Sequence, residues 1–290
     1  MTIANATEWD QARERCRHYR RRILQISQRI SALHIAPAFS CLEMVDAIYN
    51  MLMPRVDGAP ADTFVMSKGH GVMSQYVVLE DLGILSKEAL DTYCTPQGTL
   101  GAHPDYGVPG IEASTGSLGH GLAIAAGMAY ADRIRKRDRT TFVVLGDGEM
   151  QEGSVWEAIM MAPNLKLSNL VALLDFNNYQ GLGKTTETHP HFLPMSEKVA
   201  SFGWEAVDID GHDHQSLVNA IRGRRGDRPL FLTCTTVKGN GVSYMIDAPI
   251  WHYRSPNPAE YVQALKELGF DPEAKCCLLY TSPSPRDQRG

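Results

Sequence analysis

Two short polar motifs, each following an apolar run, are the residues of this chain best suited to hold a charged ligand. Asp147 lies in a Gly-Asp-Gly triplet after residues 141–145, and Asn177 lies in an Asn-Asn pair after residues 170–174. The 154–161 segment between them has helical character, so the three parts predict a βαβ unit. Parallel strands end at the same edge of a sheet, and we therefore expect Asp147 and Asn177 to converge there.

The chemistry of these two side chains favours a divalent cation. A carboxylate and an amide oxygen are hard ligands that suit Mg²⁺ or Ca²⁺, and the sequence does not separate the two ions. Mg²⁺ usually completes its coordination with water and phosphate oxygens. The glycines allow the backbone to approach a phosphate, and the following helix directs free N–H groups to the same place. The motifs thus predict a diphosphate anchored through a cation.

The spacing of the two motifs resembles the thiamine diphosphate signature, and the likeness extends to the transketolase family over about residues 10–270. It is to the N-terminal, diphosphate-binding half, which is a separate subunit in split transketolases. The segments that carry the resemblance are 32–34 with Ser40, 67–71, 101–104, 115–121, 146–153, 175–178, 210–213 and 236–241. The resemblance implies an α/β fold, a doubly wound parallel sheet with helices on both faces, in one domain over 8–270.

The resemblance also implies a role for individual residues, together with thiamine diphosphate and Mg²⁺ (or Ca²⁺) as cofactors. The implied metal ligands are Asp147, Asn177 and the backbone carbonyl of Tyr179. The implied cofactor contacts are His70, Gly116, Ser117, Leu118, Gly148 and Asn177. The implied catalytic residues are His34, His103 and His252, with Glu152 in a carboxylate network at a subunit interface. Many members have Gly after the histidine that His252 matches, whereas Tyr253 and Arg254 follow it here.

The implied reaction transfers a two-carbon ketol unit from a ketose, phosphorylated by resemblance, to an aldose through a thiamine diphosphate carbanion. Histidine suits the proton transfers of such a reaction because its pKa lies near neutral pH. Other histidines are expected to be structural or on the surface: His18, His189, His191 and His214. His120 and His212 stay open between a functional and a structural role. Lys238 is either a solvated loop charge or a phosphate contact.

A catalytic half is missing from this chain. Transketolase-like catalysis needs a pyrimidine-binding domain that contributes a glutamate, and the sequence contains one α/β unit. We therefore expect a C-terminal partner subunit in an α₂β₂ assembly, or else truncation of a longer chain. The alternatives are a 2-oxo acid dehydrogenase α subunit, which the histidine set disfavours, and a non-catalytic cofactor-binding paralogue, which intact Asp147, Asn177 and Glu152 disfavour.

Composition limits the remaining functions. The 290 residues carry a net charge of −5, which argues against nonspecific nucleic-acid binding. The basic stretch at 13–22 is expected to be the solvated face of an amphipathic helix. No apolar run approaches the roughly 20 residues of a membrane span, no signal peptide is recognisable, and the six cysteines form no Cys-x-x-Cys pair. These features favour the cytoplasm and no membrane contact.

Periodicity and turn residues predict an alternation of helices and strands. Helices are expected at 8–33, 42–51, 73–82, 87–92, 119–133, 154–161 and 214–222, and strands at 64–66, 141–145, 170–174, 205–209 and 230–235. The Ala- and Gly-rich 119–133 helix is expected to be buried on all sides. The Gly/Pro-rich loop at 95–116 contains His103 and is expected to be functional. The tail at 276–290 resembles translated sequencing-adapter DNA and is expected to be artefactual or disordered.

Overall fold

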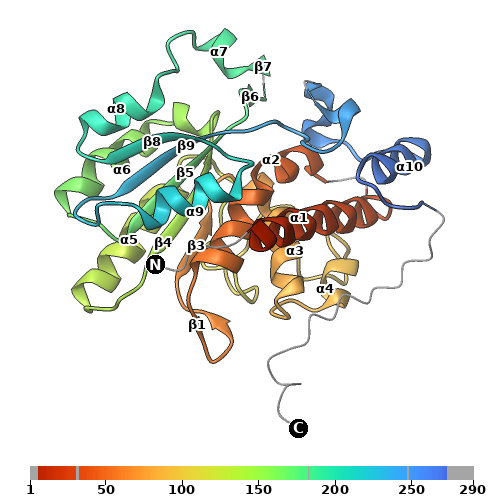
Figure 1. Cartoon of the computed structure of the whole chain (residues 1–290), viewed down its shortest axis with the longest axis horizontal. Coiled ribbons are helices and arrows are strands. Elements are labelled where there is room, and N and C mark those ends of the chain that lie inside the picture. Colours follow the sequence, from red (N-terminus) through yellow and green to blue (C-terminus); the bar gives the residue numbers. More distant parts are fainter. Residues whose placement is uncertain (1–5, 31–32, 182, 247, 273–290) are drawn as a thin grey trace.

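A five-stranded parallel sheet forms the centre of the protein (Figure 1). The computed structural model describes residues 6–272 except 31, 32, 182 and 247, so the 276–290 tail lies outside the described part. The strand order is β3-β4-β5-β9-β8, with every neighbouring pair parallel. The strands are β3 (Thr63–Met66), β4 (Thr141–Gly146), β5 (Leu170–Phe176), β8 (Glu205–Asp210) and β9 (Leu230–Thr235). The predicted doubly wound parallel sheet is confirmed.

The central strands are buried because both of their faces are covered. Every residue of β4 and β5 is buried, as expected for continuous apolar runs in a parallel sheet. Successive side chains point to opposite faces. Phe142 and Val144 therefore join one hydrophobic cluster, while Val143 and Leu145 join the other.

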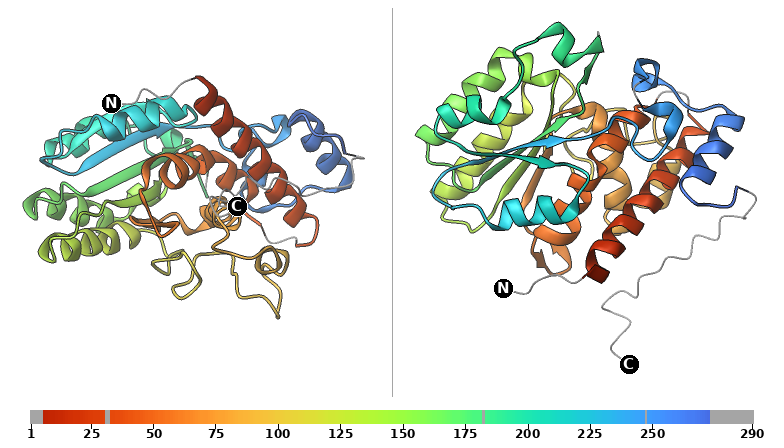
Figure 2. Two further views of the ribbon diagram at one scale, coloured as in Figure 1. Left: turned by 60° about the horizontal axis from the view of Figure 1, so that its bottom comes forward. Right: turned by 45° about the horizontal axis from the view of Figure 1, so that its top comes forward.

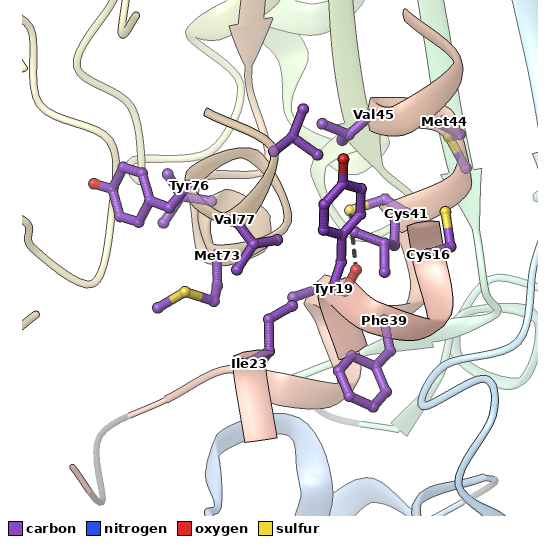
Figure 3. Packing of buried hydrophobic residues seen from close by; sticks show 14 of the residues in the cluster. Cys16, Tyr19, Ile23, Phe39, Cys41, Met44, Val45, Met73, Tyr76 and Val77 are labelled. Carbon is purple, nitrogen blue, oxygen red and sulfur yellow. Dashed lines mark hydrogen bonds between the residues drawn. The ribbon is translucent and has the colours of Figure 1, made fainter. Parts of the chain in front are cut away.

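Helices cover each face of the sheet (Figure 2). One face packs against α1 (Ala6–Ser27), α2 (Ile35–Asp46), α3 (Val72–Asp81) and α9 (His214–Arg222). The opposite face packs against α5 (Gly121–Ile134), α6 (Gly153–Asn164) and α8 (Met195–Ser201). Buried side chains of α1, including Tyr19 and Ile23, interlock with those of α2 and α3 (Figure 3).

Short elements connect these layers and shape the loops near the site. They are η1 (Ala47–Leu52), β1 (Arg55–Val56), β2 (Ala59–Pro60), η2 (Gly69–Gly71), α4 (Lys87–Asp91), η3 (Glu149–Gln151), β6 (Tyr179–Gln180), β7 (Gly183–Lys184), α7 (Thr185–Thr188), η4 (Ser243–Met245), η5 (Pro249–Tyr253) and α10 (Pro258–Glu267). Within the described residues, none of the helices is both long and apolar enough to cross a membrane.

Three helix predictions were wrong in their extent or environment. The helix expected at 8–33 ends at Ser27, because the next N–H groups bond to carbonyls three residues back and tighten the turn. The helix expected at 42–51 begins at Ile35, with Pro37 in a first turn that tolerates it. α5 is not buried on all sides, since Gly127 and Tyr130 lie on an exposed face.

The prediction of a solvated basic face at 13–22 was also wrong. Arg20 and Arg22 are only 5% and 8% exposed. Arg20 pairs with Glu43 of α2 at 2.7 Å, and Arg22 pairs with Glu80 of α3 at 2.7 Å. These arginines hold α1 against its neighbours, because a buried guanidinium requires a carboxylate partner.

Candidate active site

The predicted site residues gather around the carboxyl edge of the sheet. Four strands end there and release the loops that contain Lys68, Asp147, Asn177 and Lys238. The remaining site segments are the start of α2, the long loop before α5, and η5. Backbone direction thus brings together residues that are far apart in the sequence.

Asp147 and Asn177 both lie buried at this edge. Asp147 is 2% exposed, and its carboxylate accepts hydrogen bonds from Thr185 Oγ1 at 3.0 Å and from the Gly148 N–H at 2.9 Å. Burial, with the nearby charge of Asp175, raises the pKa of Asp147 to about 7. The Asn177 Oδ1 atom accepts from the Tyr179 N–H at 3.0 Å. Thr185 was not anticipated, because nothing in its own sequence context marks it.

Asp175 is the centre of a buried polar network behind these two residues. It is fully buried, accepts hydrogen bonds from Ser40 Oγ at 2.7 Å and Asn177 Nδ2 at 3.1 Å, and forms an ion pair with Lys68. Thr236 Oγ1 also donates to it. Asp175 and Lys68 lie in the recognised motifs, but the sequence did not reveal that they pair. The network turns the amide nitrogen of Asn177 inward, which leaves its oxygen toward the Tyr179 side.

Glu149 holds three glycine-rich loops together. Its carboxylate is 1% exposed and accepts hydrogen bonds from Ser67 Oγ and from the N–H groups of Gly119 at 3.0 Å and Gly146 at 3.2 Å. Burial raises its pKa. Sequence reasoning missed Glu149 because an acid at a helix start is common for reasons unrelated to a site.

Four histidine rings form one cluster, which we call the imidazole cluster: His34, His70, His103 and His252. The ring centroid of His34 lies 5.7 Å from that of His70, 5.8 Å from His103 and 5.5 Å from His252. His70 and His252 are 5.3 Å apart. The Nδ1 atom of His34 is buried and has no hydrogen-bond partner within the described residues.

The environment of the imidazole cluster favours neutral rings. Burial lowers the pKa of His34 to about 4 and that of His252 to about 3, with smaller effects from neighbouring lysines. Burial and the charge of Lys68 also hold the pKa of His70 well below its usual value. Neutral imidazoles can accept protons at pH 7, which general base catalysis requires.

Lys238 belongs to the site and is not a solvated loop charge. It is 5% exposed, and its Nζ lies 2.9 Å from His252 Nδ1 and 5.4 Å from the centre of the Tyr179 ring. Burial, with repulsion from Lys68, lowers the pKa of Lys238 to about 8. As a protonated lysine only donates, His252 Nδ1 is the acceptor in this contact.

Glycines allow two loops to approach closely beside the cluster. Gly116 has φ +129°, and a Cβ atom there would lie 2.8 Å from His103 Cδ2. A Cβ atom on Gly69 would lie 2.8 Å from the Gly116 backbone. Ser117, which follows, is exposed, and Leu118 is half-buried. Larger residues at either glycine would push the two loops apart.

His212 connects elements near the site without joining the imidazole cluster. Its Nε2 accepts from the Val237 N–H at 2.8 Å, so Nδ1 carries the proton that faces Glu43 at 2.9 Å. His214 is buried against Asp46 at 3.0 Å. His120, by contrast, is exposed at the N-cap of α5.

The residues that depart from the family pattern have separate environments. Tyr253 is 53% exposed, and its ring centroid lies 4.6 Å from that of His34. Arg254 is turned away, since its Nη2 lies 2.7 Å and 2.8 Å from the two Glu260 carboxylate oxygens. Glu152 is exposed at the N-cap of α6.

The parallel sheet, the polar ligands at its carboxyl edge and the glycine-lined loops define an α/β protein of the thiamine diphosphate-binding class. The family model described as "Transketolase, thiamine diphosphate binding domain" matches residues 25–279. The chain therefore belongs to the transketolase family.

Curated relatives resemble this chain over most of their length. One of the two subunits of apulose-4-phosphate transketolase from Phocaeicola vulgatus is 39% identical over 255 residues, which cover 86% of this chain and 90% of that relative. The 6-deoxy-6-sulfo-D-fructose transketolase subunit SqwG of a Clostridium species is 37% identical over 218 residues, which cover 73% and 79%. This chain is a subunit of a transketolase-type transferase and works with a partner subunit. The 2-oxo acid dehydrogenase alternative receives no support.

Solved transketolases share the fold. The Campylobacter jejuni enzyme matches with a TM-score of 0.83 at 23% identity, over 94% of this chain and 44% of that one. The Pichia stipitis enzyme in complex with sedoheptulose 7-phosphate matches with a TM-score of 0.80 at 26% identity, over 90% and 41%. This chain thus spans less than half the length of these solved transketolases.

Proposed function

We propose that this chain contributes the metal ligands, the diphosphate contacts and the histidines of a heteromeric ketol-transferring enzyme. The observation that carries the proposal is the imidazole cluster at the same sheet edge as buried Asp147 and Asn177. Moving a ketol unit requires protons to leave and return at sugar hydroxyls, and neutral imidazoles can accept them.

Asp147, Asn177 and the backbone carbonyl of Tyr179 would hold the divalent cation, Mg²⁺ or Ca²⁺. The buried Asp147 carboxylate accepts only from a hydroxyl and a backbone N–H among its hydrogen bonds described above, and both donors are neutral. A cation would compensate the charge that these donors leave unbalanced. The Asn177 Oδ1 atom has a second lone pair besides the one that faces Tyr179. The donor set therefore fits a hard cation.

Thiamine diphosphate would lie between this cation and the imidazole cluster. Gly148 and His70 would contact its diphosphate, and Gly116, Ser117 and Leu118 would line its length. The close approach at Gly116 supports this role, because a bare backbone leaves room beside His103. The unpartnered, buried Nδ1 of His34 supports a polar ligand within reach.

When bound, thiamine diphosphate supplies the carbon nucleophile and electron sink for breaking and forming the C–C bond. His34, His103 and His252 would take protons from substrate hydroxyls and return them. Lys238 would keep His252 Nδ1 occupied, which directs Nε2 toward the ligand side. The buried network around Asp175 would keep Asn177 oriented.

The partner subunit would cover an apolar surface formed by α5 and α6, and two copies of each chain would form an α₂β₂ assembly. α5 exposes Gly127 and Tyr130, and α6 exposes Met160 and Met161. A Cβ atom on Gly127 would meet nothing within 4 Å, so another helix can approach there. Glu152 is exposed at the start of α6, where it would join a carboxylate network between subunits. Apolar surfaces of this kind usually mark interfaces.

The substrate would be a ketose with a terminal anionic group, such as a sugar phosphate. The names of the relatives given above specify a sugar phosphate and a sulfonated sugar, and both carry such an anion. Arg254 is neutralised by Glu260, so the partner subunit would contribute the cations that recognise the anion. The free cysteines, which include buried Cys16, Cys41 and Cys234, fit a reducing cytoplasm.

The test is co-expression with the protein encoded by the neighbouring reading frame, followed by ketol-transfer and cofactor-binding assays. Asp147→Ala should abolish activity and magnesium-dependent retention of thiamine diphosphate. His103→Ala should slow turnover by a factor of about 10² or more while retention is unchanged, since general base catalysis contributes about 10²–10⁴. Asp138→Ala, an exposed loop carboxylate, is the control. Equal loss of retention in the Asp147 and His103 variants would refute these assignments.

A further inference from the structure

Tyr253 stands where the imidazole cluster opens to solvent. Its side chain is 53% exposed, whereas Asp147 at the inner end of the site is 2% exposed. The Tyr253 ring centroid lies 4.6 Å from that of His34, closer than any of the three other histidine rings to His34. A substrate that reaches His34 from solvent must therefore pass this ring.

The backbone on both sides of Tyr253 is anchored, so the ring has a defined place. Trp251 is 3% exposed and packs against Tyr244 with ring centroids 4.9 Å apart. Arg254 lies 4.2 Å over the Trp251 ring and pairs with Glu260 at 2.7 Å. Anchored aromatic rings beside a polar site commonly contact ligands through their apolar faces.

We propose that Tyr253 determines donor specificity by forming a wall beside the substrate carbons that extend beyond the cleaved bond. This inference rests on the proposed function, because it assumes that the imidazole cluster contacts the substrate. Ketol transfer breaks the bond between C2 and C3, so carbons from C3 onward project away from the cofactor and toward solvent. A phenol ring at this point leaves less space than the glycine of many family members. Short donors fit beside it, and long linear donors meet it.

The ring, rather than the hydroxyl group, carries this role. The centroid distance of 4.6 Å and the interplanar angle of 55° describe a contact between ring faces and edges. Removing the ring should therefore change specificity, and removing only the hydroxyl should not. Tyr253→Phe is the matched control for Tyr253→Ala.

The experiment uses the co-expressed heteromer with glycolaldehyde as acceptor and measures kcat/KM for two donors. Hydroxypyruvate has no sugar chain beyond the transferred unit, and sedoheptulose 7-phosphate has a long one. Tyr253→Ala should raise the ratio of kcat/KM for the heptulose phosphate to that for hydroxypyruvate about tenfold, within the roughly 10–200-fold range by which pocket shape discriminates. Tyr253→Phe should change this ratio less than about twofold. Thiamine diphosphate affinity should be unchanged in both variants.

An unchanged ratio in Tyr253→Ala would overturn the inference, as would an equal change in Tyr253→Phe. If Tyr253→Ala does not fold, Tyr253→Leu should shift the ratio in the same direction, and no shift would again overturn it. Wild-type heteromer that is active with hydroxypyruvate but shows no effect of these variants refutes only the role of Tyr253. Wild-type heteromer that transfers ketol units from no donor refutes the proposed function, and the inference fails with it.

Discussion

Removal of the buried lysine behind the metal ligands should destabilise the protein strongly. Lys68 is 1% exposed and pairs with Asp175, which is 0% exposed. Lys68→Met would leave the Asp175 charge with only hydroxyl and amide donors from Ser40, Thr236 and Asn177. Breaking one side of a buried ion pair costs about 3–5 kcal/mol, because the remaining charge stays desolvated.

The assay is urea unfolding of the purified chain without cofactor, followed by far-UV circular dichroism. With a slope of about 3 kcal/mol per molar urea, a loss of about 3–5 kcal/mol lowers the midpoint by about 1–1.7 M. Lys87→Met removes an exposed lysine at the start of α4 and should change stability by less than about 0.5 kcal/mol.

A second substitution separates loss of charge balance from loss of packing. Asp175→Asn in the Lys68→Met background removes the unpaired charge and should restore at least half of the lost stability. The reasoning is refuted if Lys68→Met costs less than about 1 kcal/mol, or if the double variant is no more stable than the single one. A refutation would mean that water or a rearranged side chain compensates Asp175.

Two further predictions concern the loops and the histidines. Gly116→Ala places a Cβ atom 2.8 Å from His103 at φ +129°, and it should weaken thiamine diphosphate binding at least tenfold; Gly83→Ala, with φ +68° and nothing within 4 Å, should leave binding unchanged, and equal affinities would contradict the close-approach argument. Below pH 6.5 the unfolded chain protonates His34 and His252, whereas the folded chain resists protonation down to about pH 4 and pH 3 respectively. The unfolded state therefore binds more protons in this window, and stability should fall as the pH is lowered, by at most about 1.4 kcal/mol per pH unit for each ring before solvent screening reduces it. Urea midpoints at pH 7, 6 and 5 would measure this fall, and His252→Asn should make it shallower; identical slopes would show that His252 does not contribute.

Sequence reasoning located the regular elements best where one periodicity dominates. The bounds of β9 and α9 agree with the expected 230–235 and 214–222. β4 and β5 were recognised because continuous apolar runs between turn residues are typical of buried parallel strands. Boundaries failed where packing decides them, as at Ser27, beyond which the side chains still look helical.

The charged residues of α1 show why local patterns misjudge burial. Arg20 and Arg22 look like a solvated face because arginine is seldom buried. Their carboxylate partners, Glu43 and Glu80, lie on other helices. No local pattern contains that pairing, so only the folded arrangement reveals it.

The sequence by itself determined the chemical types at the site and the sheet edge where they meet. Asp147 and Asn177 follow consecutive parallel strands, and such strands must release their loops on the same side. The resemblance to the transketolase family added the histidines, which no periodicity would have joined.

Only the tertiary structure decided how these groups are surrounded. It paired Lys68 with Asp175, placed Glu149 under three loops and set Tyr253 against His34. These contacts join residues tens to more than two hundred positions apart. Burial and neighbouring charges then set the pKa values, since desolvation depends on everything packed around a group and not on its neighbours along the chain.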